Sequence, residues 1–135
     1  MSISQQEKKH VYYNNNGRGK SFWGPPVWQT IHIFAATLRP ESSKAFIDFL
    51  WLLTVLLPCE ECREALKKKL ESIPLEKYIS NNHDAFFLSY LIHDMANEDI
   101  NSKHPDIPVH VSPTFEDIKN FFFSGLGKEC KMCHS

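Results

Sequence analysis

The chain has 135 residues, with 15 lysines and arginines against 16 aspartates and glutamates, so its formal net charge is −1. This length fits one domain, and the balanced charge lacks the basic excess typical of nucleic-acid-binding proteins, so we expect no nucleic-acid partner. Apolar residues make up 42% of the chain and include ten phenylalanines, which is enough for a core and excludes wholesale disorder.

Residues 1–21 are polar and contain the run NNNGRG, so we interpret them as a flexible N-terminal arm. They lack the apolar core of a secretory signal. The longest apolar stretch, residues 46–57, is too short to span a bilayer, which needs roughly 20 residues. We therefore expect a cytoplasmic protein that is not secreted and has no transmembrane segment.

Two helices are predicted next. The first begins at residues 24–26, because proline suits a helix start, and it ends near residue 40. One of its faces carries Trp28, Ile31, His32, Ala35 and Leu38. The second helix has Ser42 or Ser43 as its N-cap. Its body at residues 46–57 is apolar nearly all round, so we expect burial on more than one side.

Three further helices are predicted after Pro58. The third begins around Cys59 and ends at residues 72–74, and the fourth begins at caps within residues 81–84. A loop follows at residues 101–113. A short fifth helix is then expected through Phe123, capped by Ser112 or Thr114. Because few segments alternate with period two, the predicted class is all-α, a compact helical bundle.

The four cysteines form two pairs of identical spacing, Cys59-x-x-Cys62 and Cys130-x-x-Cys133. In a cytosolic chain such pairs indicate redox chemistry or a metal site. Zinc ribbons separate their pairs by roughly 15–20 residues, and the gap here is far longer. The spacing alone favours neither reading. One alternative is therefore a zinc-stabilised helical module that binds another protein and uses all four cysteines.

The first cysteine pair stands at a predicted helix start. The unpaired N–H groups and the helix dipole stabilise a thiolate there, and a thiolate is the attacking species in disulfide exchange. Glu60 and Glu61 oppose this effect, so the sequence does not give the net shift in pKa.

Two further pairs stand four residues apart on helix faces, Trp28 with His32 and His93 with Asn97. Singly, each is more often a satisfied core residue or a chance surface pair than a ligand site. Together with a cysteine pair at a helix start, they could clamp a planar, hydrogen-bonding cofactor inside a bundle.

The order of these motifs resembles the Erv/ALR family of FAD-linked sulfhydryl oxidases. The matching residues are Gly24-x-x-x-Trp28-x-x-x-His32, then Pro58-Cys59-x-x-Cys62, then His93-x-x-x-Asn97. The resemblance covers about residues 23–123. The short chain without a visible targeting segment looks more like the small oxidases of large DNA viruses, which would place it in the host cytoplasm or the virion.

The resemblance implies a four-helix bundle that holds FAD, with a short fifth helix, in an oxidase domain at residues 22–124. It implies a homodimer formed through the first two helices. It also implies that thiols of a protein substrate attack Cys59, and that Cys62 lies against the flavin and passes electrons to it. Molecular oxygen would then accept the electrons and give hydrogen peroxide.

The same resemblance implies the cofactor-binding residues. Gly24 belongs to the motif, and Trp28 and His32 would line the flavin pocket. His93 and Asn97 would hold the adenine end, and Lys103 would contact the nucleotide, although it lies one position later than in the relatives. No metal ligand is implied.

Two positions depart from the family pattern. Pro25 stands where an arginine is common, so a phosphate or ring contact would be missing or supplied by Arg18 or Lys20. Asp94 stands where asparagine is usual, and an ionised carboxylate cannot donate a hydrogen bond as an amide does.

The second cysteine pair lies in a tail at residues 125–135, which Gly125 and Gly127 are expected to release. Cys130 and Cys133 are either a mobile shuttle disulfide or a clamp on the C-terminus. We favour the shuttle, because moving elements are drawn from low-stability segments.

Overall fold

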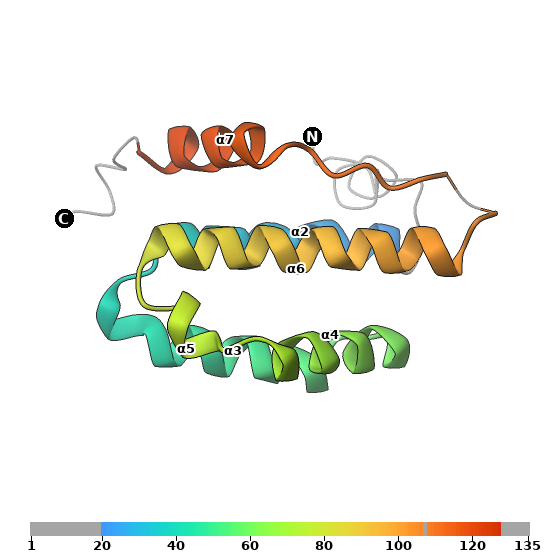
Figure 1. Ribbon diagram of the computed structural model, residues 1–135, viewed down its shortest axis with the longest axis horizontal. Helices are drawn as coiled ribbons and strands as arrows, with labels where there is room; N and C mark the ends of the chain where they lie inside the picture. The colour runs from blue at the N-terminus through green and yellow to red at the C-terminus, as the bar shows by residue number, and fades with distance from the viewer. Residues whose placement is uncertain (1–19, 107, 128–135) are drawn as a thin grey trace, which may run out of the picture. The chain divides into compact units, whose positions relative to one another are not determined.

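The computed structural model describes residues 20–106 and 108–127 of the chain (Figure 1). Within these residues every regular element is a helix and no strand occurs, which confirms the predicted all-α class. Most of the predicted N-terminal arm, and the second cysteine pair, lie outside the described residues. The proposed boundaries of the oxidase domain stay predictions.

The described elements follow one another in the order predicted, with two short additions. They are α2 (Lys20–Ala36), η1 (Pro40–Ser42), α3 (Ser43–Leu56), α4 (Glu60–Ser72), α5 (Leu75–Tyr78), α6 (Asn82–Lys103) and α7 (Phe115–Gly127). The chain divides into two compact units, residues 1–30 and residues 31–135, and each is described by itself. None of the described helices is long and apolar enough to cross a membrane.

In the first unit, α2 begins at Lys20, before the predicted start at residues 24–26, so the predicted start is wrong. Pro25 and Pro26 lie inside the helix. Each proline removes one backbone hydrogen bond, but its fixed φ is close to the helical value, and both prolines lie early in the helix.

The core of the second unit is built around α6, which α3, α4 and α5 flank on one side and α7 on the other (Figure 1). Phe86 on α6 is buried and lies 5.7 Å from Phe122 and 5.3 Å from Phe123, measured between ring centroids. Phe115 at the start of α7 also contacts Phe86. These aromatic contacts attach α7 to α6.

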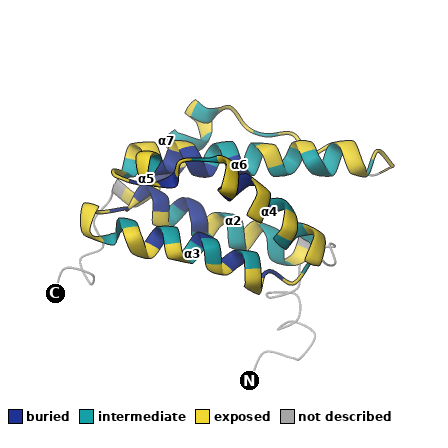
Figure 2. Ribbon diagram, turned by 60° about the horizontal axis from the view of Figure 1, so that its bottom comes forward, coloured by how far each residue is buried: buried dark blue, intermediate teal, exposed yellow. Residues whose placement is uncertain are grey.

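Helix α3 buries only one face. Phe46, Leu50 and Leu53 are buried, whereas Leu52, Val55 and Leu56 are 54%, 70% and 69% exposed. Figure 2 shows the two kinds of residue on opposite sides of the helix. The prediction of burial on more than one side is therefore wrong, because no described element covers the second apolar face.

The predicted N-caps are largely confirmed. Asn81 Oδ1 accepts the backbone N–H of Asp84 at 2.9 Å, and Thr114 Oγ1 accepts that of Asp117 at 3.2 Å. Thr114 is therefore the cap of α7. Ser42 occupies the N-cap position of α3, but its hydroxyl donates instead to the carbonyl of Arg39.

Several predicted ends are wrong. Helix α6 continues to Lys103, into the expected loop, and α7 continues to Gly127, past the expected end at Phe123. Gly125 and Gly127 therefore do not release the chain before residue 128. Glycine costs about 1 kcal/mol in a helix relative to alanine, and the aromatic packing of α7 on α6 outweighs that cost.

Candidate redox and cofactor site

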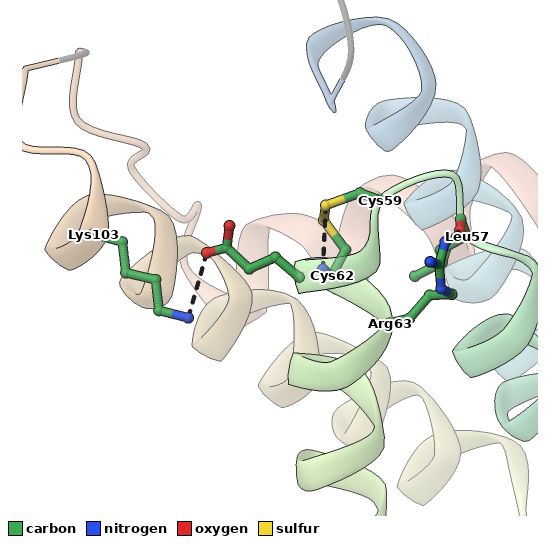
Figure 3. Close-up of a disulfide and its surroundings, with 6 residues drawn as sticks. Leu57, Cys59, Cys62, Arg63 and Lys103 are labelled. Atoms are coloured by element: carbon green, nitrogen blue, oxygen red, sulfur yellow. Dashed lines mark hydrogen bonds and ion pairs between the residues drawn. A yellow bond between two sulfur atoms is a disulfide. The ribbon is translucent and has the colours of Figure 1, made fainter.

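A disulfide joins Cys59 and Cys62 at the start of α4 (Figure 3), with 5.1 Å between their Cα atoms. Cys59 is the N-cap in an extended conformation, and its Sγ accepts the backbone N–H of Cys62 at 3.2 Å. Pro58 separates this turn from the end of α3. This hydrogen bond satisfies one of the backbone N–H groups that have no partner within the helix at its start. The sulfur of Cys59 therefore lies where a helix best stabilises negative charge.

Arg63 holds this turn in place. Its Nη1 donates to the carbonyl oxygen of Leu57 at 2.6 Å, and its backbone N–H donates to the carbonyl of Cys59 at 3.0 Å. The side chain extends toward Leu57 and away from the sulfur atoms (Figure 3). It thereby satisfies a carbonyl at the end of α3 and ties that end to the first turn of α4. The sequence feature that could have predicted this role is the position of Arg63. It directly follows Cys62 and lies in the first turn after Pro58, which ends the preceding helix.

Lys103 lies beside the disulfide turn. Its Nζ is 3.5 Å from Oε1 of Glu61, the residue before Cys62, and both side chains are half exposed. An exposed ion pair of this kind contributes about 0–1 kcal/mol, so it exchanges readily for another partner. The role predicted for Lys103 toward a nucleotide stays a prediction.

A second ion pair joins α4 to α6 more firmly. Lys69 is buried, and its Nζ lies 2.6 Å from Oδ2 of Asp99. Both residues line a groove of about 490 Å³, together with Glu61, Met95 and Lys103. The disulfide turn is therefore tied to α6 along one side of that helix.

Two predicted residues meet in the core, although they come from helices far apart in the sequence. His32 Nε2 lies 3.0 Å from His93 Nδ1. His32 Nδ1 lies 2.8 Å from Ser89 Oγ, which in turn donates to the carbonyl of Phe86 at 2.7 Å. Ser89 was not predicted. Its signal is its position four residues before His93, on the same face of the helix.

Burial keeps both histidines neutral. Burial, and to a smaller extent the neighbouring His93, lower the pKa of His32 from 6.5 to about 3. Burial also lowers the pKa of His93, to about 4, while Asp94 opposes the shift and His110 adds to it. At neutral pH each imidazole therefore carries one N–H donor and one acceptor nitrogen.

Asn97 fastens the segment after α6. Its Nδ2 donates to Ser112 Oγ at 3.0 Å. Asn101 bonds both backbone groups of His110, and Tyr90 donates to the carbonyl of Pro113. The structure thus pairs Asn97 with the loop, and its role toward adenine stays a prediction. Gly24 and Trp28 belong to the first unit, so their predicted place beside His32 also stays a prediction.

Residues 20–106 and 108–127 contain no group of three or more histidine, cysteine or acidic side chains arranged to hold a metal ion. The disulfide also occupies the sulfur atoms of Cys59 and Cys62. A zinc site needs its cysteines as thiolates. In this disulfide-bonded state, two of the four cysteines that the alternative zinc-stabilised module would need as ligands are not thiolates.

The described residues thus form an all-helical protein with a Cys-x-x-Cys disulfide at the start of a helix. The family model described as Erv1 / Alr family matches residues 25–116, and the chain belongs to this family. The cofactor of the family is FAD.

A similar protein is "Putative FAD-linked sulfhydryl oxidase 096R" of Invertebrate iridescent virus 3. It is 26% identical over 83 residues, which cover 58% of this chain and 56% of the viral protein. The chain thus matches somewhat more than half the length of that relative. The similarity supports the predicted resemblance to viral oxidases. No solved structure matches the chain significantly.

The neutral histidines predict acid sensitivity. Below pH 6.5 both histidines become protonated in the unfolded chain. In the folded chain the pKa of His32 is about 3 and that of His93 about 4, so both stay neutral there. The free energy of unfolding should therefore decrease as the pH is lowered below 6.5, by at most about 1.4 kcal/mol per pH unit for each histidine.

The measurement is urea unfolding between pH 7.5 and pH 5, on the wild type and on His32→Gln. The variant should show a slope shallower by the contribution of one histidine. Ser102→Ala, which changes a side chain that does not titrate, is the control and should keep the wild-type slope. Equal slopes for the wild type and His32→Gln would contradict the assignment.

Proposed function

We propose that the protein is an FAD-dependent sulfhydryl oxidase that forms disulfides in thiol-containing protein substrates. The observation that supports this proposal most strongly is the Cys59–Cys62 disulfide at the start of α4, in a chain of the Erv1/Alr family. The printed name of the viral relative supports the same activity. We retain the cytoplasm, as host cytoplasm or virion, as the proposed location.

The residues present fit the cofactor. An isoalloxazine and an adenine are planar, uncharged rings that offer both donors and acceptors. Neutral imidazoles can hydrogen-bond such rings without placing an unpaired charge in the core, and His32 and His93 are neutral. We propose that these two residues, with Trp28, Gly24 and Asn97, hold the cofactor, and that Lys103 reaches its phosphates.

The cysteine pair can accept two electrons from a substrate by thiol–disulfide exchange. One substrate thiolate attacks Cys59 Sγ, which breaks the Cys59–Cys62 bond and frees Cys62 as a thiolate. A second substrate thiolate then attacks the substrate sulfur of the mixed disulfide and expels Cys59. The substrate leaves as a disulfide, having lost two protons and two electrons, and the pair is left reduced.

The N-cap position of Cys59 favours the second step. Exchange is faster when the leaving thiol is more acidic. The backbone N–H of Cys62 already points at Cys59 Sγ, and it would stabilise the thiolate that is expelled. When bound, the cofactor supplies a two-electron acceptor that oxygen can reoxidise, with hydrogen peroxide as product. We assign Cys62 to the cofactor side of the pair.

We predict that Cys62→Ser keeps FAD bound but abolishes flavin reduction by dithiothreitol. The reason is that the variant has no second sulfur to form the disulfide. The measurement is the flavin absorbance near 450 nm, followed anaerobically after addition of the dithiol, with peroxide release in air. Glu71→Gln, which changes an exposed residue near the other end of α4 and keeps both sulfurs, is the control that should still reduce flavin. Normal turnover by Cys62→Ser would refute the assignment.

The tail pair remains a proposal from the sequence, because Cys130 and Cys133 lie outside the described residues. We propose that they carry electrons from protein substrates to Cys59. We predict that Cys130→Ser leaves turnover with dithiothreitol unchanged and impairs turnover with a reduced protein, assayed by oxygen consumption. Lys131→Ser, which keeps both sulfurs, is the matched control. Equal activity of Cys130→Ser on both substrates would favour the clamp.

We further propose a homodimer. The support is the exposed apolar face of α3, made of Leu52, Val55 and Leu56, and the exposed Phe34, whose ring meets Phe49 of α3 edge-on. Exposed apolar residues that gather on one face are typical of an interaction site. A second copy of the chain presents the same face, as a two-fold interface requires.

We predict that Val55→Glu converts the dimer to a monomer, because a carboxylate would lose its hydration in an apolar interface. The measurement is the molar mass by light scattering on a size-exclusion column. Val111→Glu is the control, because Val111 is also exposed but lies on the loop before α7. A wild-type monomer, or a dimer that survives Val55→Glu, would overturn this interface.

A further inference from the structure

The two residues between the cysteines are both glutamates, but only one of them has an ion-pair partner. Glu61 Oε1 lies 3.5 Å from Nζ of Lys103 on α6 (Figure 3). Glu60 is exposed and has no ion-pair partner among the residues that the structure describes. A cation from another helix therefore neutralises one of the two carboxylates and not the other.

Reduction of the disulfide changes the charge of this turn. The Cys59–Cys62 bond takes up two electrons, and with one proton it gives a thiol and a thiolate, or with two protons it gives two thiols. A nearby carboxylate disfavours the thiolate, and a nearby ammonium group favours it. Charges beside the turn therefore act on the reduced pair and not on the uncharged disulfide.

The two cations near the turn are held in different ways. Arg63 donates to the carbonyl oxygen of Leu57 at 2.6 Å, and its side chain extends away from the sulfur atoms (Figure 3). Lys103 comes from the end of α6, and the described interaction that holds its ammonium group at the turn is the ion pair with Glu61. The position of this positive charge thus depends on Glu61.

We propose that Lys103 is a positioning residue that acts through Glu61 and makes the Cys59–Cys62 pair a stronger oxidant of thiols. Glu61 holds the ammonium group beside the turn, and the positive charge lowers the free energy of the reduced pair. The proposal rests on the proposed function, in which this disulfide takes electrons from substrate thiols. Both side chains of the ion pair are half exposed, so the effect is modest.

The test is the equilibrium of the pair with glutathione, in which two glutathione thiols reduce the disulfide and leave as glutathione disulfide. It is measured without oxygen on the FAD-free full chain at pH 8, by alkylation of free thiols and mass spectrometry of the peptide that carries Cys59 and Cys62. Lys103→Met should lower the equilibrium constant for reduction roughly two- to threefold, as expected for a half-exposed charge. Lys103→Arg keeps the charge and should keep the wild-type constant.

A double-mutant cycle tests the role of Glu61. In the Glu61→Gln background Lys103 has lost its partner, so Lys103→Met should change the constant less than in the wild type. In the Glu60→Gln background it should have its full effect, because Glu60 is not paired with Lys103. Lys77→Met, which removes an exposed lysine of α5, is the control for net charge and should leave the constant unchanged.

Salt separates an electrostatic role from a merely structural one. The cycle is run at about 10 mM salt, where the Debye length is about 30 Å, and repeated at about 1 M, where it is about 3 Å. The difference between the wild type and Lys103→Met should be large in the first condition and nearly vanish in the second.

An unchanged constant in Lys103→Met, or an equal fall in the wild-type and Glu61→Gln backgrounds, would overturn the proposal. A difference that about 1 M salt leaves intact would also overturn it. The equilibrium is measured without FAD, so it stands apart from the oxidase activity. The expected shifts in a chain that binds no FAD and forms no peroxide would support the role of Lys103 and refute the proposed function.

Discussion

The hydrogen bond between His32 and Ser89 is the constraint on which the second unit depends. It places polar atoms in a core whose other buried side chains, apart from Lys69, are apolar. A buried polar group without a partner costs about 1–3 kcal/mol, so the end of α2 and the middle of α6 are held at one register. No buried side-chain nitrogen or oxygen among the described residues lacks a partner.

The aromatic packing around these hydrogen bonds also affects the charge of the imidazole. Phe86 and Phe122 lie 5.7 Å and 5.3 Å from the His32 ring and exclude water from it. That exclusion lowers the pKa of the imidazole and keeps it neutral. A neutral ring has a donor side and an acceptor side, whereas a protonated ring has only donors. Helix α7, which the sequence predicted only as a short fifth helix, thus helps to keep this imidazole neutral.

Local signals in the sequence were sufficient for some features. The Cys59–Cys62 turn and the caps Asn81 and Thr114 depend on short spacings or on recognised motifs, whereas the contact between His32 and His93 was not predicted. Features decided by tertiary contacts were missed. The one-sided burial of α3 depends on which elements reach it, and the length of α7 depends on packing against Phe86. Ser89 and Arg63 acquire their roles only from partners elsewhere in the chain.

Helix α6 connects the two parts of the candidate site, because its residues divide between two faces. Ser89, His93 and Asn97 recur every four residues on one face, and Met95, Asp99 and Lys103 do so on another. The second face holds the disulfide-bearing helix through Asp99 and Lys103. Roughly 15 Å of continuous helix separates His93 from Lys103. The hydrogen-bonded pair His32–His93 and the ion pair Lys103–Glu61 beside the disulfide therefore keep a fixed spacing along α6. A cofactor held at the histidines would therefore meet the cysteine turn at a distance set by one rigid element and not by a flexible loop.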